Sequence, residues 1–492
     1  MMFRLPGLKL LRLISLLLTL VFSAAVSAQP PAQAPVHGAA TDQKPQAESP
    51  SQPAARAESR ITPQQAEELF RDVDTILDFA SKDTSLPIKH EVKRRLTSRD
   101  EVVAYLKKNM AEDKDVKRLR RTELVLKKFG LLPKDFDLQT FLVSLLEEQV
   151  AGYYDAKTKT VNLLDWVVPD LQRPVLAHEL THALQDQSFG LDKWLRKDSE
   201  DLDTKKEITP DDITRDENSE ARQAVVEGQA MVVLVDYMLA PMGRTVVDSP
   251  EVVEILNQGM ASGTADSVQY KNAPIFMKEE LTFPYRYGVE FEAQLLRAQG
   301  KEKAYKATFE DPPRTSREIM EPKTYLSGEH LAPLPLPDFK RIFKDYDRFD
   351  VGAIGEFDVA VLAEQYAGED ASHRIYPFWR GGYYYSAHPK KNEVAPLSLL
   401  FVSKWESAKA AAEFAAIYAR GIQQRYKNAE VPPPLPPDLK NLQTLGGDHT
   451  WKTEDGPIVI AVKDETVLVT ESLEPALTDE FRRAIFTAQT QP

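Results

Sequence analysis

Several features are missing or scarce in this sequence, and each absence narrows what the protein can be. None of the 492 residues is a cysteine, which excludes disulfide bonds, thiolate metal ligands and thiol nucleophiles. Only eight residues are histidine, and acidic side chains outnumber basic ones, so the formal net charge is −13. Nucleic acids and anionic membranes carry charge of the same sign, so we expect neither as a partner.

An apolar run close to the N-terminus, Leu13–Phe22, is too short for a membrane span of about 20 residues. Three basic residues precede it, and the small residues Val26-Ser27-Ala28 follow it as a cleavage-type end. This pattern predicts a signal peptide over residues 1–28, export to the periplasm or the extracellular space, and no stable membrane span after cleavage. An uncleaved membrane anchor is the disfavoured alternative.

Composition divides the rest of the chain into four parts. Residues 29–60 are rich in Pro, Ala, Gln and Ser, which predicts a disordered linker. Helix-start signals at Thr62-Pro63 and at Ser98 predict a helical N-terminal region over residues 61–147. Residues 148–330 hold the motifs described below and are expected to form the catalytic domain. After a Pro/Leu-rich boundary, strands and helices predict a C-terminal α+β domain over residues 338–492.

Local patterns within the central part predict a hairpin followed by helices. Two β-prone runs, 150–155 and 160–164, flank a polar turn. Taking Pro174 and Pro284 as residues of the first helical turn, we expect one helix from Pro174 to Gly190 and another over 284–298. A strongly apolar helix is expected over 219–239.

The first of these helices carries the motif His178-Glu179-Leu180-Thr181-His182. Residues i and i+4 share a helix face, so both imidazoles can reach one metal ion, and Glu179 can polarise a water bound there. An apolar stripe on the opposite face disfavours the alternative of a surface helix with two chance histidines. The spacing predicts a zinc-hydrolase centre with His178 and His182 as ligands and Glu179 as the catalytic base.

A catalytic zinc usually takes a third protein ligand, for which Glu227 is the main candidate. Its helix is apolar on nearly every side, and a buried carboxylate there needs a cation or another partner. Gly228 would let a backbone or ligand approach closely. A salt bridge from Glu227 to a buried arginine, or its exposure to solvent, is the alternative. Glu220 is the second candidate ligand, and both Glu220 and Asp186 are candidate acceptors for the outer nitrogen of a ligand histidine.

Six motifs together resemble the gluzincin branch of the zincin metallopeptidases and, more closely, a group of exported bacterial metallopeptidase-like proteins. They are GYYD, VNLL, HELTHALQDQ, AVVEGQA, FPYRYG and PPRTSREIMEPKTYL, all within residues 148–326. The resemblance implies a zincin fold, a Zn²⁺ held by His178, His182 and Glu227, and hydrolysis of a peptide or protein substrate with Glu179 as general base. It also implies that the predicted hairpin pairs with the extended substrate.

Two points of the family pattern stay open in this chain. The family continues with an HPxxY segment, but Glu321 stands where its histidine is expected, so the role of that histidine does not transfer. An oxyanion donor besides the metal is also needed, and Tyr285 and Tyr287 are the candidates, although the ordinary role of a core or rim aromatic is favoured for each.

We therefore expect an α+β protein with a mainly helical zincin-like metallopeptidase core, a small sheet before the HExxH helix and a C-terminal α+β domain. The expected function is that of an exported zinc metallopeptidase. One alternative is a catalytically inactive or highly specialised zinc-bearing binding or scaffold protein of the cell envelope. Another is a zymogen in which residues 62–147 are an inhibitory pro-segment.

Overall fold

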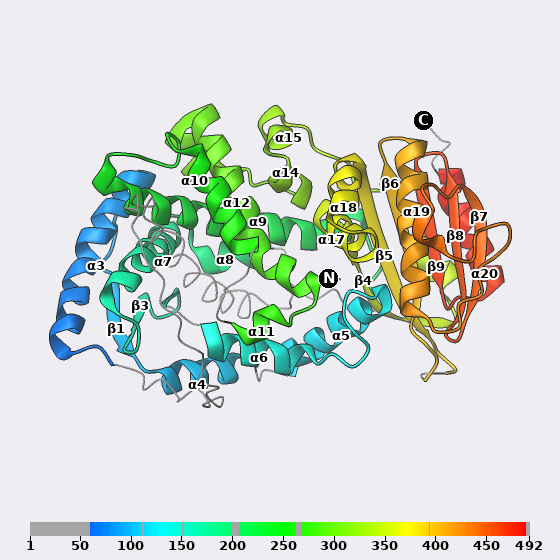
Figure 1. The fold of residues 1–492 in the computed structure, drawn as a ribbon, viewed down its shortest axis with the longest axis horizontal. Helices are drawn as coiled ribbons and strands as arrows, with labels where there is room; N and C mark the ends of the chain where they lie inside the picture. The colour runs from blue at the N-terminus through cyan, green and yellow to red at the C-terminus, as the bar shows by residue number, and fades with distance from the viewer. Residues whose placement is uncertain are drawn as a thin grey trace, which may run out of the picture.

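The computed structural model describes residues 60–110, 113–149, 152–197, 206–261, 267–392 and 394–488. The expected signal peptide, and all of the expected linker except Arg60, lie outside the described residues. The described chain forms an elongated body with helices at one end and a large sheet at the other (Figure 1). Helices make up 58% of the structure and strands 16%, and the strands form two separate sheets. This confirms the predicted α+β class.

The first part of the chain combines helices with a small mixed sheet. Its elements are α3 (Pro63–Thr84), β1 (Lys93–Thr97), α4 (Arg99–Met110), α5 (Asp113–Phe129), α6 (Leu138–Gln149), β2 (Tyr153–Asp155), β3 (Thr160–Leu164), α7 (Pro169–Phe189) and α8 (Leu191–Leu195). The sheet has the order β1-β3-β2, with β1 parallel and β2 antiparallel to β3. The hairpin β2–β3 confirms the prediction, whereas β1 appears in a region predicted as helical.

Two long helices dominate the middle of the chain. Its elements are α9 (Pro210–Leu239), η1 (Ala240–Met242), α10 (Pro250–Ala261), α11 (Val268–Lys271), α12 (Ile275–Glu302), η2 (Lys303–Ala307), α13 (Thr308–Glu310), α14 (Ser316–Met320) and α15 (Pro322–Ser327). Three predicted helix starts were wrong: α7 begins before Pro174, α9 before Ser219 and α12 before Pro284. An interior proline removes one backbone hydrogen bond, and the packing of α7 and α12 against α9 outweighs that loss.

The C-terminal part is an antiparallel sheet between helices. Its elements are α16 (Phe339–Ile342), β4 (Tyr346–Ala353), α17 (Glu356–Ala367), α18 (Glu369–Ile375), η3 (Tyr376–Phe378), β5 (Trp379–Pro389), β6 (Ser398–Trp405), α19 (Ala408–Arg425), η4 (Leu439–Asn441), β7 (Gly447–Thr453), β8 (Gly456–Lys463), β9 (Thr466–Glu471) and α20 (Pro475–Ala488). The strand order is β4-β5-β6-β9-β8-β7. Side chains alternate between the faces, so Phe401 packs with α19 and Leu400 packs with α16 and α20.

The end of α5 packs against the large sheet of the C-terminal part. The ring of Phe129, at the end of α5, packs edge-on against Tyr384 of the large sheet. The buried Lys128 ammonium lies 3.8 Å from Glu471, which also accepts a 2.7 Å hydrogen bond from Arg425. Burial opposes ionisation of Glu471, yet these two cations hold its pKa below the usual value. Excising residues 62–147 would remove β1 and, with Lys128 and Phe129, the contacts of α5 with the large sheet. This argues against the pro-segment alternative.

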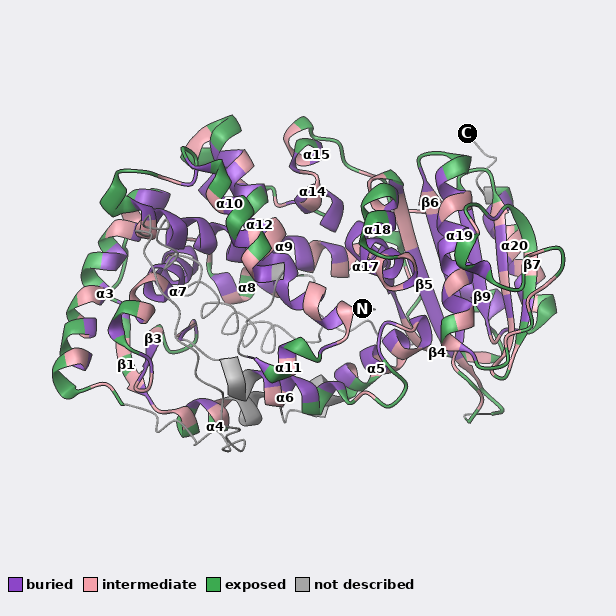
Figure 2. Ribbon diagram, viewed as in Figure 1, coloured by how far each residue is buried: buried purple, intermediate pink, exposed green. Residues whose placement is uncertain are grey.

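The crossing of α9 and α12 is a backbone-to-backbone contact. Both helices are largely buried at the middle of the helical part (Figure 2). A Cβ atom at Gly228 would lie 2.2 Å from the carbonyl oxygen of Gly288, and one at Gly288 would lie 2.4 Å from that of Ala224. The close approach predicted for Gly228 is therefore confirmed, and its partner is the backbone of α12.

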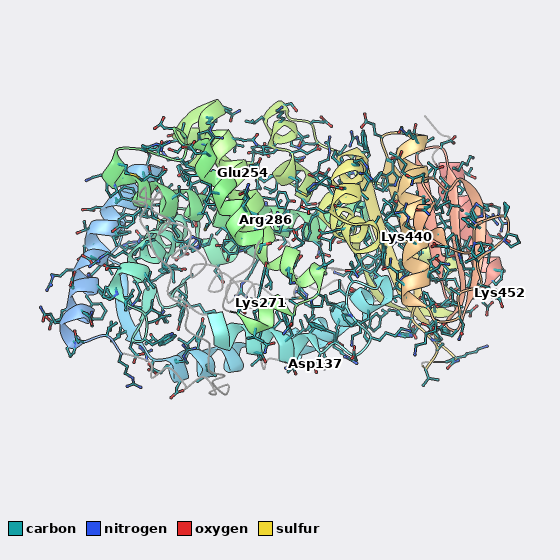
Figure 3. The ribbon with its side chains drawn as sticks, in the orientation of Figure 1. Asp137, Glu254, Lys271, Arg286, Lys440 and Lys452 are labelled. Atoms are coloured by element: carbon teal, nitrogen blue, oxygen red, sulfur yellow. The ribbon has the colours of Figure 1, made fainter. Side chains whose placement is uncertain are left out.

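One helical segment among the described residues, Pro210–Met242, is long and apolar enough to cross a bilayer. Because 72% of its most apolar window is buried inside the protein, the segment also fits the core helix of a folded domain. Figure 3 draws the described side chains on the ribbon and labels, among others, the exposed Lys271 of α11 and Lys452 of β7.

The glycine contact predicts a stability difference. Gly228→Ala should lower the free energy of unfolding by about 1–3 kcal/mol or more, because the new methyl group would push α9 away from α12. Gly259 is a matched control on α10, with no atom within 4 Å of its added Cβ. Gly259→Ala should stabilise by up to about 1 kcal/mol through helix propensity. Denaturant unfolding measures both, and equal effects of the two substitutions would contradict the packing argument.

A second stability prediction concerns Glu292 on α12. Its carboxyl group is fully buried, and neither oxygen has a hydrogen-bond partner among the described residues. Burial raises the pKa of Glu292 well above 4.5. Above that pH the folded protein binds more protons here than the unfolded chain does, so this group lowers the free energy of unfolding as pH rises.

Glu292→Gln should therefore stabilise the protein more at about pH 8 than at about pH 5, since an amide does not ionise. Denaturant unfolding at both pH values measures this difference. Glu67→Gln, on the exposed face of α3, is the control and should leave the pH dependence of the wild type unchanged. If Glu292→Gln also leaves it unchanged, the buried carboxyl does not titrate as we infer.

Candidate metal centre

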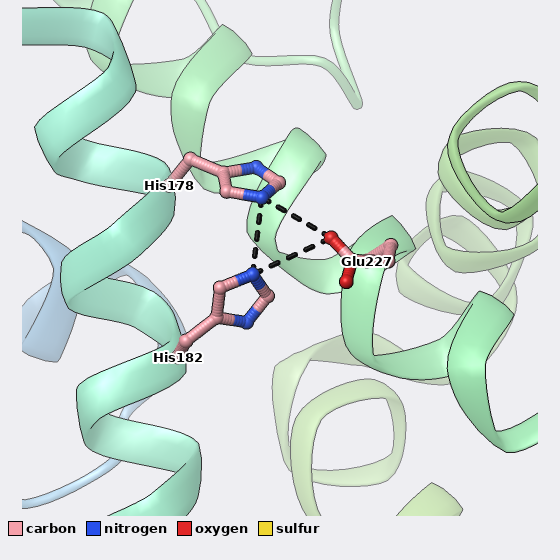
Figure 4. Close-up of side chains that lie close together, drawn as sticks. All are labelled: His178, His182 and Glu227. Carbon is pink, nitrogen blue, oxygen red and sulfur yellow. Dashed lines mark hydrogen bonds and ion pairs between the residues drawn. The ribbon is translucent and has the colours of Figure 1, made fainter. Parts of the chain in front are cut away.

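Two helices bring three possible ligand side chains together (Figure 4). His178 and His182 come from successive turns of α7, and Glu227 comes from α9. The two imidazole Nε2 atoms are 3.0 Å apart, and Glu227 Oε2 lies 3.2 Å from that of His178 and 3.4 Å from that of His182. All three side chains are buried. The structure thus gathers the three residues predicted as ligands into one group.

The separations within this group fit one metal ion. Bonds of about 2.0–2.1 Å at tetrahedral angles place two ligand atoms about 3.3–3.4 Å apart. The three measured separations, 3.0, 3.2 and 3.4 Å, are close to such tetrahedral edges. Three protein ligands leave the fourth corner of the tetrahedron for a water or a substrate atom. The group can therefore bind a metal ion.

The charges of the three groups are strongly coupled. Burial lowers the pKa of His178. Burial acts in the same direction on His182, but the carboxylate of Glu227 outweighs it and raises the pKa of His182 to about 9. Burial also opposes ionisation of Glu227, yet the two imidazoles hold its pKa below the usual value. A proton and a bound cation would therefore compete for the same position between the three groups.

Glu179 lies beside the first ligand and is held by the hairpin. Its Oε2 accepts a 2.7 Å hydrogen bond from the backbone N–H of Tyr154, and its Oε1 has no hydrogen-bond partner among the described residues. Burial raises the pKa of Glu179 to about 7. Asp186 accepts hydrogen bonds from the Tyr154 hydroxyl (2.9 Å) and from the Lys159 ammonium (2.5 Å). Asp186 therefore anchors the hairpin to α7. Among the described residues its donors are Tyr154, Lys159 and Leu191, and not a ligand histidine, so the predicted role of Asp186 was wrong.

Two glutamines hydrogen-bond to candidate ligands, at the ligand atoms that face away from the metal position. Gln185 Oε1 lies 2.9 Å from His182 Nδ1, and Gln223 Nε2 donates to Glu227 Oε1 at 2.6 Å. The second contact leaves Glu227 Oε2 facing the imidazoles. Sequence reasoning missed both glutamines, although each lies three or four residues from its ligand on the same helix face. Glu220 is buried but does not belong to the ligand group.

The remaining candidates separate clearly. The Tyr285 ring lies 6.3 Å from that of His178, whereas the Tyr287 ring packs against Phe283 on another side of α12. Tyr285 is therefore the tyrosine beside the metal ligands. Glu321 lies 3.3 Å from Arg317 in an ion pair, and within the described chain it does not join the ligand group.

Comparison with protein-family models, curated proteins and solved structures finds no match.

The ligand assignment predicts a difference between two glutamates of α9. Glu227→Ala should weaken binding of a divalent metal by at least about 100-fold, because losing a group outside the ligand shell alone costs 10–100-fold. Glu220→Ala should leave the affinity close to that of the wild type. Metal content after dialysis and competition with a chelator measure the effect. A large loss in Glu220→Ala and none in Glu227→Ala would reverse the assignment.

Proposed function

We propose that the protein is an exported zinc-dependent metallopeptidase that hydrolyses peptide bonds in peptide or protein substrates. The supporting observation is the convergence of two imidazoles and one carboxylate within 3.0–3.4 Å, with Glu179 next to the first imidazole. A ligand set of two imidazoles and a carboxylate with an open fourth position is the set of a catalytic zinc. Export follows from the signal-peptide pattern of residues 1–28.

The chemistry divides between the metal and Glu179. Bound zinc would lower the pKa of a water and polarise the substrate carbonyl. Glu179 is the proposed general base: it takes a proton from the attacking water and then delivers it to the leaving amine. The Tyr154 N–H fixes one oxygen of Glu179 at 2.7 Å, which leaves the other oxygen for the proton transfer. Tyr285, beside His178, is the proposed donor to the developing oxyanion.

The edge strand β2 is the proposed guide for the substrate. In the order β1-β3-β2 it pairs with β3 on one side. The N–H of Tyr154 donates to Glu179, so the other side of β2 faces the proposed base. An extended peptide added to this edge would run past Glu179. Because the Tyr154 N–H is already held by Glu179, the peptide would hydrogen-bond to the other backbone groups of this edge.

Replacing the base tests the proposal. Glu179→Gln should keep zinc content at the wild-type level and slow the hydrolysis of unfolded protein by about 10²–10⁴-fold, since an amide cannot accept the proton. Asp170→Asn, an exposed position of the same helix, is the control and should keep full activity.

Two outcomes would change the conclusion. Retained hydrolysis in Glu179→Gln would remove Glu179 as the base. If the wild type binds zinc but cleaves neither unfolded protein nor a broad peptide library, the inactive scaffold becomes the better description.

A further inference from the structure

Two buried glutamines connect His182 to a backbone carbonyl on the far side of α9. Gln185, on α7, donates through Nε2 to the carbonyl of Val226 at 3.1 Å and to Gln229 Oε1 at 3.0 Å. Gln229, on α9, donates through Nε2 to the carbonyl of Ala304 at 2.9 Å. Both glutamines are 0% exposed. The hydrogen-bonded series thus links α7, α9 and η2.

The far end of this series fixes the direction of each hydrogen bond. A carbonyl can only accept, so Gln229 must turn its NH₂ group towards Ala304 and its oxygen towards Gln185. Gln185 therefore donates from its own NH₂ group to the Gln229 oxygen, and the same NH₂ group donates to the carbonyl of Val226. The oxygen of Gln185 is therefore left facing His182, 2.9 Å from Nδ1.

Thr308 removes the remaining freedom at Gln229. Its hydroxyl donates to the carbonyl of Ala304 at 2.7 Å, so a lone pair of Thr308 Oγ1 faces the Gln229 NH₂ group at 3.1 Å. Both neighbours of that NH₂ group are then acceptors, and turning the amide over would place oxygen against oxygen. Buried polar atoms would then lose their partners, which disfavours the turned amide.

We propose that Gln185 and Gln229 are positioning residues that hold His182 in the tautomer with its proton on Nδ1. The Nε2 lone pair is then the one available to a metal ion held beside Glu227. This inference rests on the proposed zinc function and deepens it. The Gln185 oxygen is an acceptor, so a lone pair on Nδ1 would face a second lone pair at 2.9 Å in a buried space. Metal binding through Nδ1 is disfavoured in the same way.

An amide suits this position for two reasons. Its oxygen accepts from Nδ1–H, and the amide itself neither gains nor loses a proton when an ion binds. It also adds no negative charge, unlike the carboxylate that often holds a ligand histidine. The bound ion is then balanced by Glu227 alone among its ligands.

Zinc affinity, measured by competition with a chromophoric chelator, tests this hydrogen-bonded series, the relay from Gln229 through Gln185 to His182. Gln185→Leu should bind zinc about 10–100-fold more weakly. Gln185→Met fills nearly the same volume without an amide oxygen and should lose as much zinc affinity as Gln185→Leu. Gln187→Leu is the matched control: this glutamine of α7 hydrogen-bonds to the backbone of Lys89 and His90, away from the ligands. Wild-type affinity in Gln185→Met would reduce Gln185 to a packing role and overturn the proposal.

Nuclear magnetic resonance of zinc-loaded wild type with ¹⁵N-labelled histidine reads the tautomer directly, even if Gln185→Leu fails to fold. The expected result is a protonated Nδ1 and a zinc-bound Nε2 at His182, and zinc on Nδ1 would overturn the relay. Tight zinc binding by both the wild type and Gln185→Leu would sink the relay and leave the peptidase proposal intact. A wild type that binds no zinc would instead remove the proposed function itself, and the relay with it.

Discussion

A buried negative charge, the carboxylate of Glu227, is the constraint on which the rest of the site depends. Its helix is enclosed by apolar packing for most of its length, so an ionised carboxylate there needs a positive partner. The two imidazoles of α7 meet this need, through a proton when the metal is absent. The contact between Gly228 and Gly288 sets how deeply α9 sits, because no side chain separates the two backbones. One helix crossing thus decides where the carboxylate lies.

Sequence was informative wherever the signal was local. The predicted helix start at Thr62-Pro63 is confirmed: Thr62 and Gln65 form a capping box and Pro63 lies in the first turn, all within one helical turn. His178 and His182 were found for the same reason, since a four-residue spacing fixes their common face. Glu227 was found by a different route: a carboxylate in a strongly apolar helix is costly enough to require an explanation.

Features that depend on distant partners could not be predicted in this way. β1 has the polar sequence KRRLT, and its pairing with β3 joins residues that are far apart in the chain. The partner of Gly228 lies on another helix, so the sequence predicted a close approach at Gly228 but could not identify the backbone of α12 as its partner. Gln185 lay within reach of the helical spacing rule, but its meaning comes from Gln229 and Ala304, which no local pattern connects to it.

The embedding of α5 in the C-terminal part has a consequence for how the polypeptide reaches its native state. Lys128 hydrogen-bonds to Ser472, 344 residues further along the chain. A ribosome has therefore completed all six strands of the large sheet before the end of α5 can find its neighbours. Closing so long a loop is slow to achieve by random search. The end of α5 can therefore complete its native contacts only after the last strand of the large sheet has been made.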